Sequence, residues 1–182
     1  EEFLPVCGVV GLGRWIAGGR TELVPRLRAA ASDPRWRVRE GVAMALQRIG
    51  DADFPALLAM AAAWAEGGRL EQRAAVAGLC EPRLLGDEAR VRAVLDVLDA
   101  VTGTLRGAAD RKDEAFRVLR KALGYCWSVA IAASPADGKR RFERWVADPD
   151  ADVGWVVREN LRKKRLERLD AEWVAVGPAE AR

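Results

Sequence analysis

The chain has 182 residues, of which half are hydrophobic and 31% are charged, and its formal net charge is +3. This composition supports a folded core, and no apolar run is long enough to cross a membrane. The chain lacks histidine and has three widely spaced cysteines, Cys7, Cys80 and Cys126, which excludes Ser–His and Cys–His nucleophile pairs and the usual zinc sites. We therefore expect no metal and no cofactor, and a cytoplasmic protein with reduced thiols.

Helical periodicity runs through almost the whole chain and is interrupted by short Gly, Pro and Asp breaks. Residues 1–20 are expected to form an irregular N-terminal cap. Four helix pairs are then predicted at residues 21–50, 52–80, 87–133 and 135–169, with a C-terminal tail at 170–182. The pattern predicts an all-α protein with a single domain over residues 1–182.

The second helix of the first pair has the clearest signals. In DPRWRVREGVAMAL, we expect Asp33 to cap the helix and Pro34 to occupy its first position. Val38, Val42 and Leu46 then follow at helical spacing, which predicts one apolar stripe toward the core.

The pattern D-x-x-W-x-V-R-E occurs at Asp33–Glu40 and again at Asp152–Glu159. LEQRAAVAGL, at residues 70–79, matches it more weakly and places an arginine where the first copy has one. FRVLRKAL, at residues 116–123, is a still weaker match, with Phe116 in the place of the tryptophan. The steps between copies fit the length of a helical hairpin, so we interpret them as structural repeats. The positions expected to support the repeat are Asp33, Trp36, Arg39, Arg73, Asp152, Trp155 and Arg158.

Seven tryptophans are present. We expect Trp36 and Trp155 to cover the end of the core, and Trp64, Trp127 and Trp145 to lie within it. Trp173 in the tail is either a docking residue or a cover for the last helix.

Residues 23–51, LVPRLRAAASDPRWRVREGVAMALQRIGD, resemble a HEAT repeat. The resemblance rests on Pro25 in the first helix, Asp33 at the turn, and Val38 and Arg39 early in the second helix. It implies antiparallel helix pairs stacked into a right-handed α-α superhelix, with Asp–Arg ladders between repeats. It implies no particular chemistry.

The resemblance favours a non-enzymatic scaffold that presents a helical surface to another macromolecule, with a protein as the expected partner. The second helix of each pair would line this surface. The exposed candidates are Arg35, Arg37, Glu40 and Gln47 in the first pair, and Glu159, Arg162 and Lys163 in the last.

Nucleic-acid binding is the alternative. Residues 106–168 contain 16 Lys and Arg against 10 Asp and Glu, and such a basic region can bind phosphates. Its candidate contacts are Lys139, Arg140, Arg144, Arg162 and Lys163. This alternative includes an enzyme, a DNA glycosylase resembling the AlkD-type alkylation repair proteins, although no active-site motif of that family is matched. A solvated terminal cap would also explain the same charges.

Overall fold

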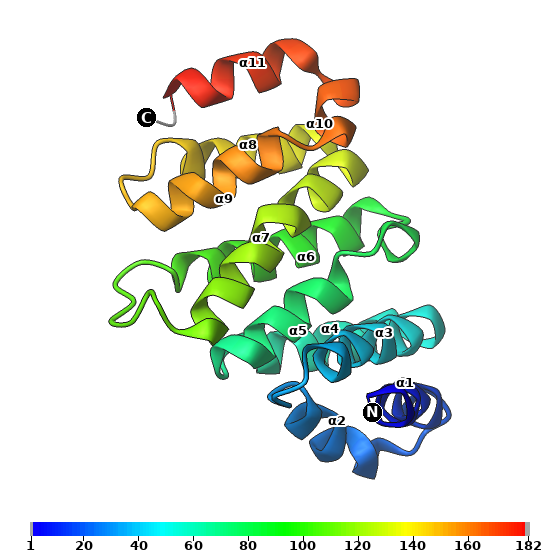
Figure 1. Ribbon diagram of the computed structural model, residues 1–182. Coiled ribbons are helices and arrows are strands. Elements are labelled where there is room, and N and C mark those ends of the chain that lie inside the picture. Colours follow the sequence, from blue (N-terminus) through cyan, green and yellow to red (C-terminus); the bar gives the residue numbers. More distant parts are fainter. Residues whose placement is uncertain (1, 181–182) are drawn as a thin grey trace. The chain divides into compact units, whose positions relative to one another are not determined.

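The computed structural model describes residues 2–180, and the side chains of residues 2–177. The described part consists of α-helices and two short 3₁₀ helices, without a strand, which confirms the all-α prediction (Figure 1). None of its helices is both long enough and apolar enough to span a membrane. Backbone contacts divide the chain into two compact units, Glu1–Leu84 and Leu85–Arg182. A single domain over residues 1–182 stays a prediction.

The first unit begins with a regular helix. The expectation of an irregular cap at residues 1–20 is therefore wrong, because residues 3–17 form a helix that packs along the helix at residues 36–52. The contact is close at Gly13, where an added Cβ would lie 2.5 Å from the carbonyl oxygen of Ala45. The elements of this unit are α1 (Phe3–Ala17), η1 (Thr21–Leu23), α2 (Val24–Ala30), α3 (Trp36–Ala52), α4 (Phe54–Ala65), α5 (Arg69–Leu79) and η2 (Pro82–Leu84).

Helix α3 is the centre of the first unit. It packs against α1 on one side and α5 on the other, while α4 packs against both α3 and α5. Buried residues lie on more than one side of α3, and Val42 and Leu46 are fully buried. Trp64 of α4 is 2% exposed, as expected for a core tryptophan. Two predicted pairs, 21–50 and 52–80, thus correspond to α2–α3 and α4–α5.

The start of α3 differs from the sequence prediction. The helix begins at Trp36 without a side-chain cap, so Asp33 is not its N-cap and Pro34 is not its first residue. The Asp33 carboxylate instead accepts from the backbone N–H of Arg35 at 2.8 Å and from its guanidinium. The Arg35 hydrogen bonds lower the pKa of Asp33 to about 2.

The second unit contains two helix pairs and two further helices. Helices α7 and α9 pack side by side, α6 pairs with α7, and α8 pairs with α9. The predicted tail is helical over residues 171–180 and contacts α8 and α9. The elements are α6 (Glu88–Gly103), α7 (Glu114–Ala133), α8 (Pro135–Val146), α9 (Ala151–Leu161), α10 (Lys164–Leu169) and α11 (Ala171–Glu180).

Aromatic side chains fill much of the second core. Trp127 is fully buried, its ring centroid lies 5.4 Å from that of Phe142, and its indole N–H donates to the Thr102 hydroxyl at 3.0 Å. Trp145 is also buried and donates to Asp99 at 2.8 Å. Trp173 packs against Phe142, so it covers the neighbouring helix α8. The core assignments of Trp127 and Trp145 are confirmed.

Candidate functional site

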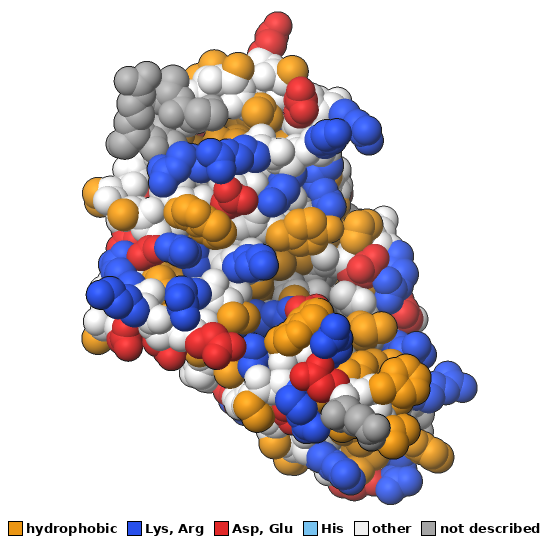
Figure 2. Space-filling model, in the orientation of Figure 1, with side chains coloured by type: hydrophobic (Ala, Val, Ile, Leu, Met, Phe, Trp, Pro, Cys, Tyr) orange, Lys and Arg blue, Asp and Glu red, His pale blue; other side chains and the backbone are white. Residues whose placement is uncertain are grey.

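An open groove lies between α1 and α3 in the first unit. Its volume is about 500 Å³, and we call it the α1–α3 groove. Figure 2 shows hydrophobic side chains gathered at this end of the first unit, with Lys and Arg side chains among them. The residues that line the groove are Glu2, Phe3, Val6, Trp36, Arg37, Glu40 and Met44.

Helical spacing explains which side chains meet in this groove. Trp36, Glu40 and Met44 are four residues apart and therefore share one face of α3. Phe3 and Val6 face them from the first turns of α1. Three of these apolar side chains are largely open to solvent: Phe3 is 76% exposed, Trp36 54% and Met44 47%. The exposure of Trp36 contradicts the expectation that this ring covers the end of the core.

The charged residues of the groove are paired at its rim. The Arg37 guanidinium lies 4.7 Å from the centre of the Trp36 ring and donates to Glu2 at 3.0 Å. Glu40 accepts a hydrogen bond from Arg73 of α5. The groove therefore combines an apolar surface with compensated charges, and this arrangement suits an apolar side chain of a ligand.

The predicted repeat arginines of the first unit have a packing role. Arg39 is 6% exposed and donates to the backbone oxygens of Asp33 at 2.8 Å and Pro34 at 3.1 Å. Arg73 is 8% exposed and donates to the backbone oxygen of Arg39 at 3.0 Å. These bonds link α5 to α3 and α3 to its preceding turn. Of the predicted binding residues, Arg37 and Glu40 line the α1–α3 groove, whereas Arg35 lines a second groove beside α1.

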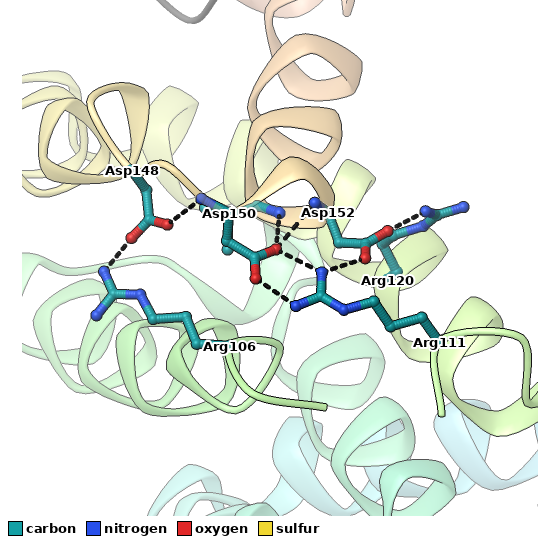
Figure 3. Close-up of polar contacts among 7 residues, drawn as sticks. Arg106, Arg111, Arg120, Asp148, Asp150 and Asp152 are labelled. Carbon is teal, nitrogen blue, oxygen red and sulfur yellow. Dashed lines mark hydrogen bonds and ion pairs between the residues drawn. The ribbon is translucent and has the colours of Figure 1, made fainter. Parts of the chain in front are cut away.

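The second copy of the repeat motif lies in a different environment (Figure 3). The N-cap of α9 is Asp150, which accepts from the N–H groups of Asp152 and Val153, so Asp152 is not the cap. Arg111 donates to Asp150 and Asp152, at 2.6 Å in each case, and Arg120 of α7 also binds Asp152. The hydrogen bond from Arg111 holds the pKa of Asp150 at about 2 and raises the pKa of Arg111 itself.

Trp155 lies against α7, unlike its exposed counterpart in the first unit. The Arg120 guanidinium is 4.5 Å from the Trp155 ring centroid. At Gly124, an added Cβ would lie 3.0 Å from the ring, so the absence of a side chain there makes room for it. Sequence reasoning missed Arg111 and Arg120, since neither stands at the arginine position of the repeat pattern. The acidic run DPDAD was the available signal that basic partners would gather at this turn.

The predicted phosphate-binding residues are engaged inside the second unit. Each has a carboxylate partner, so the free positive charge that they offer to an anion is reduced. The partners are Asp170 for Lys139, Asp137 for Arg140, Asp99 for Arg144, and Glu159 for both Arg162 and Lys163.

Comparison with known proteins identifies the repeats. Residues 9–80 match the family model for HEAT repeats, and this stretch extends from within α1 to the end of α5. No curated protein and no solved structure matches the chain. The match agrees with helices that pack against their neighbours in sequence and with the arginine bonds that join α5, α3 and the turn before α3. Residues 9–80 are therefore similar to HEAT repeats, and the described part of the chain is all-α.

Proposed function

We propose that the chain is a non-enzymatic binding protein whose first unit binds an apolar segment of a partner protein in the α1–α3 groove. The observation that carries this proposal is the exposure of Phe3, Trp36 and Met44 around one groove. Soluble proteins rarely leave such a patch open without a use for it.

The composition of the groove favours a protein ligand. Trp, Met and Arg are enriched at protein interfaces, and Trp is a frequent hot-spot residue. Trp36 is held from one side by the stacked Arg37, and this restricts the ring before any ligand binds. A short helix or extended segment with one or two large apolar side chains would fill the groove, and its polar groups would meet Arg37 and Glu40 at the rim.

Nucleic-acid binding has weaker support. The cations that the sequence suggested for phosphate contacts are paired with carboxylates, as described above, and an anion would have to compete with those pairs. A DNA glycosylase would need, in addition, a carboxylate placed beside an aromatic base-binding pocket. The carboxylates of the α1–α3 groove, Glu2 and Glu40, are instead paired with Arg37 and Arg73.

The proposal can be tested with a library of random peptides displayed on phage, selected against the full chain. We expect the selected peptides to be rich in aromatic and large aliphatic residues. Their affinity should fall at least tenfold, about 1.4 kcal/mol, on Trp36→Ala or Met44→Ala. Fluorescence anisotropy with the synthesised peptides gives the dissociation constants.

A tryptophan of helix α1 provides a matched control. Trp15 is 60% exposed but lies outside the α1–α3 groove, so Trp15→Ala should leave peptide affinity unchanged. Equal losses for Trp15→Ala and Trp36→Ala, or no loss for either, would contradict the proposal. The same assay with a 20-nucleotide single strand and duplex at two salt concentrations tests the alternative, because phosphate binding weakens steeply with salt.

A further inference from the structure

Helix α7 of the second unit has a cationic face that the sequence prediction did not name. Arg117, Lys121 and Tyr125 follow one another at intervals of four residues, so their side chains share one face of the helix, about 6 Å apart along its axis. All three are exposed. The side chains of Arg117 and Lys121 have no hydrogen-bond or ion-pair partner among the described residues, so both positive charges are left uncompensated.

A third cation reaches the same face from α10. Arg165 donates to the Tyr125 hydroxyl at 2.6 Å, and its guanidinium lies 4.8 Å from the centre of the Tyr125 ring. No carboxylate pairs with Arg165 in the described part of the chain. A guanidinium has five N–H donors in a fixed plane, and the bond to Tyr125 uses one of them. Tyr125 therefore orients this cation, while the remaining donors can bind a ligand.

The neighbouring cations on the α9 side are neutralised by carboxylates. Arg120 binds Asp152, and Arg162 and Lys163 share Glu159. The uncompensated positive charge is therefore concentrated around Tyr125. Figure 2 shows Lys and Arg side chains gathered over α7 and α9, with hydrophobic side chains among them. We call the surface around Tyr125 the α7–α10 patch, and its members are Arg117, Lys121, Tyr125 and Arg165.

We propose that the α7–α10 patch binds an acidic segment of a partner protein, whose Asp or Glu carboxylates pair with Arg117, Lys121 and Arg165. In an extended peptide, alternate side chains point the same way and are about 6.8 Å apart, close to the spacing of Arg117 and Lys121 along α7. Two alternate carboxylates can therefore meet the two helix cations, and a third can bind the oriented guanidinium of Arg165. This site is independent of the α1–α3 groove, which lies in the first unit.

The aromatic rings near the patch favour an acidic peptide over a nucleic acid. Single-stranded nucleic acids bind through bases stacked on open aromatic faces as well as through their phosphates. Here the Tyr125 ring already carries the Arg165 guanidinium, and the nearby Trp155 ring carries that of Arg120. The rings thus hold cations, and a carboxylate bound to a guanidinium needs no ring. Three uncompensated cations also match a short acidic segment better than a phosphate backbone, which carries a charge at every nucleotide.

The first test is an NMR titration of the full chain with a peptide of ten glutamates at low salt. We expect amide shifts in α7 and α10, and binding that weakens as salt is added. Lys121→Glu and Arg165→Glu should each raise the dissociation constant about tenfold, because each replaces an attraction with a repulsion. Lys121 is exposed and its side chain contacts no described partner, so Lys121→Glu tests the patch without disturbing the fold. Arg48→Glu, at an exposed cation of α3, changes the net charge equally and should leave the dissociation constant unchanged.

The second test separates the contributions of ring, charge and ligand class. Tyr125→Phe keeps the ring but removes the hydroxyl that orients Arg165, and it should weaken binding about threefold. A peptide of ten glutamines should not bind. The absence of shifts in α7 and α10 with the glutamate peptide at low salt, or equal losses for Lys121→Glu and Arg48→Glu, would overturn the proposal. Tighter binding of a single strand of ten thymidines, lost in Lys121→Glu, would overturn it in favour of nucleic acid.

Discussion

The α1–α3 pair and the α7–α9 pair are the same kind of contact built with different chemistry. In the first unit, α1 approaches α3 backbone to backbone at Gly13. In the second, α7 and α9 are joined by a buried amide, because Asn160 accepts from the Ser128 N–H at 2.8 Å and donates to the Leu123 oxygen at 2.9 Å. The first contact depends on the absence of a side chain and the second on the presence of one.

This difference decides what each copy of the repeat motif does. The helix packed against α3 leaves Trp36 in an open groove, whereas the helix packed against α9 supplies Arg120 and Gly124 around Trp155. The local sequence is alike in the two copies, so the neighbouring helix determines whether the aromatic ring is available to a ligand. Four measurements test this comparison between the two units.

Loss of the amide at Asn160 should have the largest effect. Asn160→Ala removes three buried hydrogen bonds, two to α7 and one within α9, which should lower the free energy of unfolding by about 3 kcal/mol. Gln47 is its matched control, since its amide is only half-buried and makes a longer bond, 3.3 Å, to Ala77. Gln47→Ala should cost less than about 1 kcal/mol. Urea unfolding of the full chain measures both, and equal costs would remove the distinction between the two contacts.

The close approach of α1 to α3 should not tolerate a methyl group. Gly13→Ala places a Cβ against the Ala45 backbone, so α1 must move away, at a cost of about 2 kcal/mol. Gly11→Ala on the same helix should instead stabilise the protein by about 0.5–1 kcal/mol, because Ala has the higher helix propensity and the space is open. Thermal unfolding at low protein concentration separates the two signs. A stabilising Gly13→Ala would show that the helices are not in close contact.

Acid should weaken the second unit through its acidic turn. The pKa of Asp150 is lowered to about 2 by Arg111, from an ordinary value near 3.8. Its contribution is therefore complete above about pH 4 and is lost as the pH falls toward 2, a change of about 2 kcal/mol. Unfolding measured by urea at several pH values should show this loss. Asp150→Asn should be less stable at neutral pH and should have a shallower pH dependence, and an unchanged slope would contradict the assignment.

The two motif tryptophans should differ modestly in stability. Trp155→Ala removes a ring packed on Arg120 and Gly124 and should cost about 1–1.5 kcal/mol. Trp36→Ala should cost no more than about 0.5 kcal/mol, because more than half of the side chain is already exposed. Urea unfolding compares the two variants. A larger cost for Trp36→Ala would mean that the ring stabilises the fold rather than serving a ligand.

Much of the fold could be predicted from sequence because its helices are regular and their breaks are clear. Helix α1 was the exception, since Gly8, Gly11 and Gly13 lower helix propensity and resemble a break. Packing along α3 outweighs that cost, and one of the glycines is required by the contact itself. Propensity alone could not reveal this.

The candidate site was only partly predictable. Arg37 and Glu40 were expected at the surface because they lie off the apolar stripe of their helix. Phe3 and Val6 were missed, since their role depends on a helix that was not predicted. The ion pairs of Arg111 and Arg120 join residues more than thirty positions apart. The spacing of residues in the sequence does not show which of such distant residues come into contact.

The bond from Arg73 to the backbone oxygen of Arg39 has a consequence for how repeats diverge. Every residue type carries that carbonyl, so the acceptor persists whatever amino acid replaces Arg39. An arginine that donates to the main chain of the preceding repeat therefore does not restrict which residue type stands at the acceptor position. Successive copies can then diverge in sequence while this bond between them is kept. Repeats joined in this way can stay stacked even when their sequences no longer resemble one another.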